Sequence, residues 1–291
     1  MRLALLLVLA ACGKTEVDRE RAAKLFKEVT VDTAPGLSGL AADDTGGIWT
    51  VAERDNKIYR ITLDAADKPS LETFVVEGAP SKLDLEGIAW LGADQFALGT
   101  EGKVDGIATV LLAERRDHTI VVTRTIELPE TKIGIRLPAN HGAEGICGHG
   151  DTIIVAIEGA GNDHGKRYAP IVRIANDQIV HVHRMWLTTK IGKLSALDCT
   201  IAPDGTAEVL AIERHFTVTK LLRFTLPPTE GDITPTEILD LGAVLDSRLN
   251  LEGIAVTSTG RVVAVVDNQW KTLQGPSVLI VFYPDVVKTR Q

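Results

Sequence analysis

Apolar residues along this chain occur in short runs, and clusters of turn-forming residues separate the runs. Runs that are rich in β-branched residues and bounded by such turn signals predict β-strands. Almost no segment has the 3.6-residue period of an amphipathic helix. The pattern therefore predicts an all-β fold, with strands over 26–33, 37–41, 47–53, 58–63, 86–90, 95–100, 108–113, 119–126, 144–147, 152–157, 171–175, 179–186, 196–201, 207–212, 220–225, 237–241, 253–257, 261–266 and 278–282.

A tetrapeptide with the pattern apolar–Ser/Glu–Gly/Ala–apolar recurs within this strand pattern. Ser38 in the first copy and Glu252 in the last are 214 residues and four intervals apart, so the period is about 54 residues. A period of this size with strand-like content is typical of a β-propeller, in which each repeat forms one blade of a ring. The copies are Leu37-Ser38-Gly39-Leu40, Leu85-Glu86-Gly87-Ile88, Ala143-Glu144-Gly145-Ile146, Leu194-Ser195-Ala196-Leu197 and Leu251-Glu252-Gly253-Ile254.

The number of copies predicts the number of blades. We expect a propeller of five four-stranded blades, with six blades as the alternative if one interval hides a degenerate blade. The last repeat is one strand short, and the β-branched segment 26–33 at the front of the chain has no repeat of its own. We expect this N-terminal strand to complete the last blade, because such closure removes the open sheet edges of the ring.

Composition narrows the class of partner. The chain has 291 residues, of which 24% are charged and 45% hydrophobic, and a single globular domain fits these values. Its net charge is −8, and no run of Lys or Arg is long enough to follow a phosphate backbone. We therefore expect no nucleic-acid partner, and we expect a monomer that binds a small molecule or a protein ligand.

The first residues have the pattern of an export signal. Arg2 precedes an apolar segment, 3–10, that is too short to span a bilayer. It ends in Leu9-Ala10-Ala11-Cys12-Gly13, which resembles a bacterial lipobox. We expect a lipoprotein signal peptide at 1–11, lipidation of Cys12, a tether over 12–25 and the propeller domain over 26–291. The alternative is an ordinary secretory signal with a chance cysteine. The lipid anchor is the expected membrane contact, and the expected location is the bacterial envelope, at the outer membrane facing the periplasm or exported.

Two further cysteines, Cys147 and Cys199, occupy non-identical positions in successive repeats. We expect buried free thiols that act as small hydrophobic residues. A disulfide is the alternative, because an oxidising compartment permits one.

The repeated motif places chemistry at the centre of the ring. The innermost strand of each propeller blade lines a central channel, and the motif opens that strand. We expect Glu86, Glu144, Glu252, Ser38 and Ser195 to form a ring there. Three carboxylates in a confined channel need a cation or raised pKa values, and Ca²⁺ suits an irregular shell of oxygen ligands. The alternative is that these side chains bond the neighbouring blades together.

A second acidic residue follows each motif after 14 to 18 residues. These residues end the next strand, so they are expected on one face of the disc. Arg54 and Arg214 each follow one of them and are candidates to hold an anionic substrate group, or else to pair between blades. Glu213, Arg214, His215 and Arg54 are the candidate catalytic residues, with Glu213 or His215 moving the proton. The second set comprises Glu53, Glu101, Glu158, Glu213 and Asp267, with Asn268 beside it.

Several of these segments resemble the blade signatures of the phytase-like propellers, the "esterase-like activity of phytase" domain, which is related to SdiA-regulated secreted propellers. They are Asn140-His141-Gly142-Ala143-Glu144-Gly145-Ile146, Ile212-Glu213-Arg214-His215 and Leu251-Glu252-Gly253-Ile254-Ala255 with Val266-Asp267-Asn268. The resemblance covers about 35–283 and implies a secreted propeller that hydrolyses an ester or phosphoester. Ser38 and Ser195 depart from the glutamate of the other copies, and the chain lacks a Lys-rich face suited to phytate.

Two functions remain open at this point. One is a calcium-dependent ester or phosphoester hydrolase at the mouth of the channel. The other is a non-catalytic binding or scaffolding propeller whose acidic ring is structural.

Overall fold

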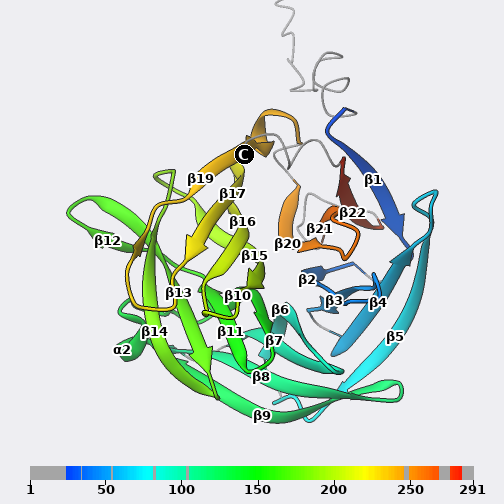
Figure 1. The fold of residues 1–291 in the computed structure, drawn as a ribbon, viewed down its shortest axis with the longest axis horizontal. Coiled ribbons are helices and arrows are strands. Elements are labelled where there is room, and N and C mark those ends of the chain that lie inside the picture. Colours follow the sequence, from blue (N-terminus) through cyan, green and yellow to red (C-terminus); the bar gives the residue numbers. More distant parts are fainter. Residues whose placement is uncertain are drawn as a thin grey trace, which may run out of the picture.

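The computed structural model describes residues 24–33, 35–53, 55–80, 83–102, 105–245, 249–268 and 276–283. Over these residues the chain is a ring of β-sheets around a central axis, with very little helix (Figure 1). The space that the innermost strands enclose around this axis is called the channel. The predicted all-β propeller class is confirmed. The predicted signal peptide, Cys12 and Arg54 lie outside the described residues. No described helix is long and apolar enough to cross a bilayer.

The innermost strands form the wall of the channel. Each begins at or just before a copy of the repeated motif, and each contacts the next in a closed order that returns from the last strand to the first. We name each blade after its innermost strand. In ring order these are β2 (Leu37–Ala42), β6 (Leu83–Gly92), β10 (Ala143–His149), β15 (Lys193–Ile201) and β20 (Asn250–Val256).

From each innermost strand the chain runs outward in antiparallel steps. The β2 and β6 blades share one eight-stranded sheet, because their outermost strands β5 and β9 pair in parallel. The β2 blade continues with β3 (Ile48–Ala52), β4 (Lys57–Leu63) and β5 (Pro69–Glu77), and the β6 blade with β7 (Gln95–Gly102), β8 (Ile107–Arg116) and β9 (Thr119–Pro129).

The β10 and β15 blades follow the same plan with additions. Strand β12 pairs with β13, and the short β18 pairs in parallel with β14. The β10 blade contains β11 (Thr152–Ile157), β12 (Gly161–Asp163), β13 (Lys166–Ala175) and β14 (Gln178–Trp186), with β18 (Asp232–Ile233) at its edge. The β15 blade contains β16 (Ala207–His215), β17 (Val218–Leu226) and β19 (Thr236–Asp240). The only helical turns among the described residues are α2 (Glu130–Ile133) and η1 (Leu241–Ala243).

The last blade is completed from the front of the chain. It contains β20, β21 (Val262–Asp267) and β22 (Ser277–Phe282), and β1 (Phe26–Val31) pairs antiparallel with β22 along its whole length. The expected closure by the N-terminal strand is therefore confirmed. Figure 1 shows β1 beside β22 at the edge of the ring.

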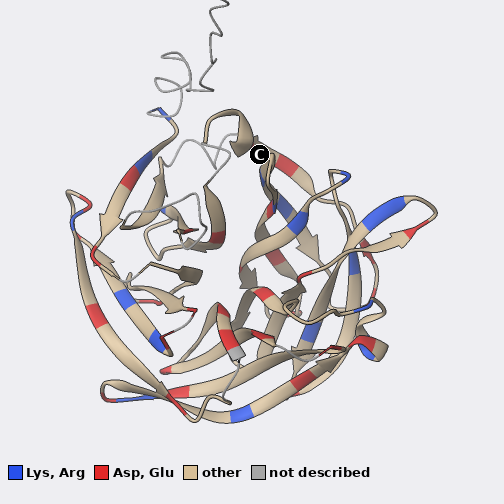
Figure 2. Cartoon of the chain, turned by 180° about the vertical axis from the view of Figure 1, so that it is seen from behind, with Lys and Arg blue, Asp and Glu red and all other residues tan. Residues whose placement is uncertain are grey.

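Apolar side chains fill the spaces between adjacent blades. Strands β3 and β21 are buried at every position, because each blade packs against a neighbour on both faces. This explains why the sequence of these strands is apolar throughout rather than alternating. Charged positions are spread over the outer strands, and acidic ones also lie on strands around the channel (Figure 2).

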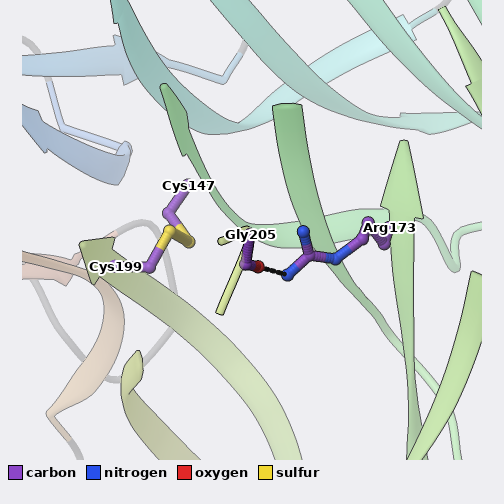
Figure 3. The surroundings of a disulfide bond; sticks show 4 residues. All are labelled: Cys147, Arg173, Cys199 and Gly205. Atoms are coloured by element: carbon purple, nitrogen blue, oxygen red, sulfur yellow. Dashed lines mark hydrogen bonds between the residues drawn. A yellow bond between two sulfur atoms is a disulfide. The ribbon is translucent and has the colours of Figure 1, made fainter. Parts of the chain in front are cut away.

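A disulfide joins Cys147 on β10 to Cys199 on β15 (Figure 3). The expectation of free thiols is wrong, and its reason fails on strand geometry. Successive side chains of a strand point to opposite faces. Adjacent blades face each other with opposite faces of their sheets. Two cysteines that meet between the blades therefore occupy positions of their repeats that differ by an odd number of residues, so the non-identical positions of Cys147 and Cys199 favour a disulfide. Beside the disulfide, the Arg173 guanidinium donates to the Gly205 carbonyl oxygen at 2.6 Å and forms a second link between these blades.

Candidate functional site

A β-bulge at the repeated motif changes the direction of the side chain at the second motif position. In β6, Leu85 lies opposite Thr100 and Gly87 opposite Gly99, so Glu86 is an extra residue with no partner. The same register shift occurs around Glu144, Ser195 and Glu252, and a related one follows Ser38. Bulges of this kind redirect a side chain. Consequently the first and fourth motif residues, such as Leu85 and Ile88, both enter the same apolar cluster.

The third motif residue is small because the strands converge there. A Cβ at Gly39 would lie 2.7 Å from the Cα of Gly87 on the next blade. A Cβ at Gly87 would collide with the backbone oxygen of Glu144. Gly39 also has a positive φ of 56°, which a side chain disfavours. The predicted convergence of innermost strands at the motif is confirmed.

Carboxylates from both predicted acidic sets meet at this end of the channel. One oxygen each from Glu53, Glu252 and Asp267 lie within 4.8 Å of one another. The Asn250 amide nitrogen donates to Glu252 at 2.7 Å and to Asp267 at 2.9 Å, and so fixes these two carboxylates. The sequence analysis predicts the motif glutamates and the second acidic set as separate groups, but in the structure they lie together in one layer.

Glu86 faces this cluster from the β6 blade. It is 9% exposed. Burial raises the pKa of Glu86 well above its usual range, and the neighbouring charges of Glu53, Glu252 and Glu144 raise it further. Burial, and then Glu144, also raise the pKa of Glu101, while a hydrogen bond from Glu86 lowers it. Burial and the neighbouring carboxylates therefore favour the protonated form of the Glu86 carboxyl group.

Lys193 pairs with the carboxylates of the β10 blade. Its ammonium group donates to Glu144 Oε1 at 2.9 Å and also to Glu158. Burial works to lower the pKa of Lys193, but the charges of Glu144 and Glu158 outweigh burial and raise it. Burial raises the pKa of Glu144 to about 7 although Lys193 works to lower it. Glu144 Oε2 is buried without a hydrogen-bond partner among the described residues.

Arg214, rather than Glu213, is the channel residue of the β15 blade. Lys193 lies opposite Arg214, which matches the pairing of Asp84 with Glu101 and of Asn250 with Asp267 in other blades. Arg214 donates to Glu252 at 2.8 Å. Burial nevertheless raises the pKa of Glu252 to about 7, with Glu144 and Asp267 adding to the rise.

Glu213 lies away from the channel, so its predicted place in the acidic ring is wrong, and its role in proton transfer stays a prediction. It is fully buried, and it accepts hydrogen bonds from the backbone and hydroxyl groups of Thr188 and Thr189 at 2.5 to 3.0 Å. Adjacent strand residues face opposite sides, so Glu213 and Arg214 cannot both line the channel. Its four hydrogen bonds make it an anchor for the loop before β15.

His215 follows Arg214 and is the last residue of β16. Burial lowers the pKa of His215, and the positive charges of Arg214, Lys193 and Arg167 lower it further. Its Nδ1 is buried with no hydrogen-bond partner among the described residues. The ring contacts Phe216 edge to face at 4.5 Å between centroids, and Phe216 is 62% exposed. A neutral imidazole therefore stands between the channel cations and an apolar surface.

The two serines and Asn268 link blades. Ser38 Oγ donates to the Glu86 backbone oxygen at 2.7 Å, and Ser195 Oγ donates to the Leu251 backbone oxygen at 2.9 Å. Asn268 Oδ1 accepts from the Gly36 amide at 3.0 Å across the closure of the ring. These contacts match the bonding alternative of the sequence analysis, and a metal-ligand role for the serines stays a prediction.

Sequence reasoning missed Lys193 and Asn250. Both stand two residues before the second motif position, where the β6 blade has Asp84. Alignment of the repeats at this position would have identified them, because the register places this residue opposite Glu101, Arg214 or Asp267 on the next strand.

The described residues of this layer carry more negative than positive charge. Eight carboxyl groups meet two cations, Lys193 and Arg214. Carboxylates that lie this close favour a bound cation or protons. Their oxygen donors fit a hard cation such as Ca²⁺, with Glu53, Glu252 and Asp267 best placed. The carboxyl groups are those of Glu53, Asp84, Glu86, Glu101, Glu144, Glu158, Glu252 and Asp267.

The ring of sheets and the buried carboxyl groups at its centre define a β-propeller with an acidic channel. The chain belongs to the phytase-like family, because the family model described as "Esterase-like activity of phytase" matches residues 32–270. A comparison with curated protein sequences gives no match.

Several solved structures are similar in fold. The PQQ-bound aldose sugar dehydrogenase of Streptomyces coelicolor is 13% identical with a TM-score of 0.47, over 88% of this chain and 98% of that one. A catalytically inactive virginiamycin B lyase of Staphylococcus aureus with quinupristin is 10% identical with a TM-score of 0.43, over 89% and 99%. The calcium-binding protein regucalcin of Agrobacterium tumefaciens is 12% identical with a TM-score of 0.37, over 83% and 71%.

Proposed function

We propose that this protein is a calcium-dependent hydrolase that cleaves an ester or phosphoester at the acidic mouth of its channel. The observation that carries the proposal is the cluster of Glu53, Glu252 and Asp267, whose oxygen atoms lie within 4.8 Å of one another beside Arg214. Membership of a family described by esterase-like activity supports the same reaction class.

Glu53, Glu252 and Asp267 are the residues that would hold the ion. The donor chemistry fits, since all three offer carboxylate oxygens and Asn250 holds two of them in place. Bound Ca²⁺ would supply charge stabilisation at the substrate oxygen and orientation for the attacking water. Glu86 would stay outside this shell, because burial and the neighbouring carboxylates favour its protonated form.

Arg214 and His215 would act on the substrate. Arg214 already donates to Glu252, and its Nε is buried without a partner among the described residues. That geometry suits a guanidinium that holds an anionic group next to the carboxylates. The neutral imidazole of His215 would accept the proton of water, because burial and then the adjacent cations keep its pKa low.

The test is turnover of p-nitrophenyl esters and phosphoesters by the chelated protein with and without added calcium. We expect calcium-dependent turnover that Glu252→Gln and Asp267→Asn abolish. Glu208→Gln is the matched control, because Glu208 lies on the outside and bonds only Thr225 among the partners described. No turnover above the Glu252→Gln background in either substrate series would exclude the hydrolase.

The second candidate is a non-catalytic binding or scaffolding propeller. The links that Ser38, Ser195 and Asn268 make between blades favour it, because they show part of the motif stabilising the ring. Calorimetric titration of calcium after chelation separates the two candidates. Glu252→Gln should lower the melting temperature under either, but it abolishes turnover only under the first.

We further infer a ring of five blades in a monomer, without a nucleic-acid partner, anchored in the bacterial envelope through lipidated Cys12. The strand order of the sheets supports five. The disulfide supports an oxidising compartment, and the Ala10-Ala11-Cys12 sequence supports lipidation. Labelling with palmitate, compared between wild type and Cys12→Ser, tests the anchor. An unlabelled wild type in the soluble fraction would exclude it.

A further inference from the structure

A second cavity lies at the other end of the innermost strands. It has a volume of about 390 Å³ and is lined by the last residues of β2, β6, β10, β15 and β20. The acidic layer is at the beginning of the same strands. In β15, Ser195 marks the end at the acidic layer and Thr200 the end at the cavity. At a rise of about 3.3 Å per residue these two residues are roughly 16 Å apart. The cavity is therefore separate from the site described above.

Asp198 is the acidic residue of this cavity. Of the described residues that line it, Asp198 and the exposed His149 are the ones with titratable side chains, and none is Lys or Arg. The Asp198 carboxylate accepts a hydrogen bond from the Val256 amide, while burial raises its pKa to about 7. Asp198 is half-buried, and a carboxylate partly withdrawn from water without a cation among the lining residues is unfavourable. A bound cation would relieve this cost.

The walls favour an organic cation over a metal ion. A single carboxylate does not make a divalent-metal site, which needs several hard oxygen ligands. The lining combines apolar residues, among them Leu40, Ile146 and Ile201, with the hydroxyl-bearing residues Thr200 and Thr257. An ammonium group on a short apolar body matches this combination. The volume is within the range of small-molecule sites.

The cavity is also held in shape. The Cys147–Cys199 disulfide joins β10 to β15 directly at its wall (Figure 3). Asp198 links β15 to β20 through the Val256 amide. A preformed wall reduces the ordering cost of binding a ligand.

We propose that this cavity is a binding site for a small organic cation, a primary amine with a short apolar chain, and that Asp198 is its counter-ion. The site is independent of the hydrolase proposed for the acidic end. Its occupancy does not require turnover.

The experiment is calorimetric titration of n-butylammonium chloride into the full-length protein at constant ionic strength, with 1-butanol and KCl as comparison solutes. We expect saturable one-site binding of butylammonium that is weaker by roughly tenfold or more in Asp198→Asn. Asparagine keeps an acceptor for the Val256 amide. Asp204→Asn is the matched control, because Asp204 is an exposed aspartate in the turn after β15 and does not line the cavity; it should bind as wild type.

A second variant guards against failure of Asp198→Asn to fold. Thr200 is exposed and shares the strand face of Asp198, so Thr200→Arg brings a tethered cation to the carboxylate and should abolish butylammonium binding. Any of three results would overturn the proposal: no saturable binding by wild type, unchanged binding by both variants, or equal binding of 1-butanol or KCl.

Discussion

Ser195 stands where three other copies of the motif carry glutamate, and its hydroxyl donates to the Leu251 backbone oxygen in the buried wall of the channel. Removal of the hydroxyl leaves that carbonyl without its described side-chain donor. We predict that Ser195→Ala lowers the free energy of unfolding by about 1 to 2 kcal/mol and leaves calcium affinity unchanged. Urea denaturation and calorimetry measure the two quantities. A loss of calcium binding at unchanged stability would make Ser195 a ligand instead.

Lys193 is the cation that lies between Glu144 and Glu158. Methionine keeps the length of the side chain and removes the charge. We predict that Lys193→Met lowers the free energy of unfolding by about 3 kcal/mol at pH 8, since loss of one partner of a buried pair leaves a charge uncompensated. The loss should be smaller at pH 6, where Glu144, with a pKa of about 7, is mostly protonated. An equal loss at both pH values would contradict this origin.

His215 is the candidate proton acceptor, and its pKa is lowered by burial and by the cations of the channel. An imidazole base is active when neutral, so activity should rise with pH and reach its plateau below the ordinary histidine range of about 6.5. We predict that His215→Gln removes this acid limb from the profile of kcat/KM against pH. Glu213→Gln should lower stability and leave the limb in place, because Glu213 is bonded to Thr188 and Thr189. An acid limb that persists in His215→Gln would assign the proton to another group.

At the scale of the element, strand positions followed from sequence better than side-chain directions did. Runs such as 95–100 and 152–157 matched β7 and β11 because turn residues bound them on both sides. Strand β5 was missed, since half of its side chains face solvent and it makes its outer contact with β9 of the neighbouring blade. The assignment of Glu213 failed because the register of β15 with β16 sets which residue faces the channel, and spacing alone does not reveal that register.

The Cys147–Cys199 disulfide closes a loop of 52 residues between two innermost strands. By the chain-entropy relation, a loop of this length stabilises the folded state by about 4 kcal/mol. We predict that the Cys147→Ala, Cys199→Ala double variant unfolds at lower urea by an amount near this value. The wild type under a strong reductant should approach the double variant. Equal stability of the oxidised and reduced wild type would show that the crosslink constrains little in the unfolded chain.

At the scale of the whole molecule, the acidic layer makes stability depend on pH in an unusual direction. The pKa values of Glu144 and Glu252 are about 7, and that of Glu86 is well above its usual range. The unfolded chain has glutamate pKa values near 4.3. Between these limits the folded state binds more protons than the unfolded state, so stability falls as pH rises from about 4.5 through 7. The lowered pKa values of His183 and His215 act in the opposite sense, below about pH 6.5.

We therefore predict that the melting temperature of the chelated protein falls as the pH is raised from 5 to 8. One carboxyl group whose pKa moves from 4.5 to about 7 corresponds to a loss on the order of 3 kcal/mol. Calcium at a hundredfold excess over its dissociation constant would restore about 2.7 kcal/mol, and it should do so at pH 8 more than at pH 5, where a proton occupies Glu252, one of the three proposed ligands. Differential scanning calorimetry at both pH values, with Glu144→Gln as the variant that removes one titrating group, measures the effect. Protons and the ion compete for the same oxygens only in the acidic layer. A calcium-induced shift in melting temperature of equal size at pH 5 and pH 8 would therefore mean that the ion binds outside this layer.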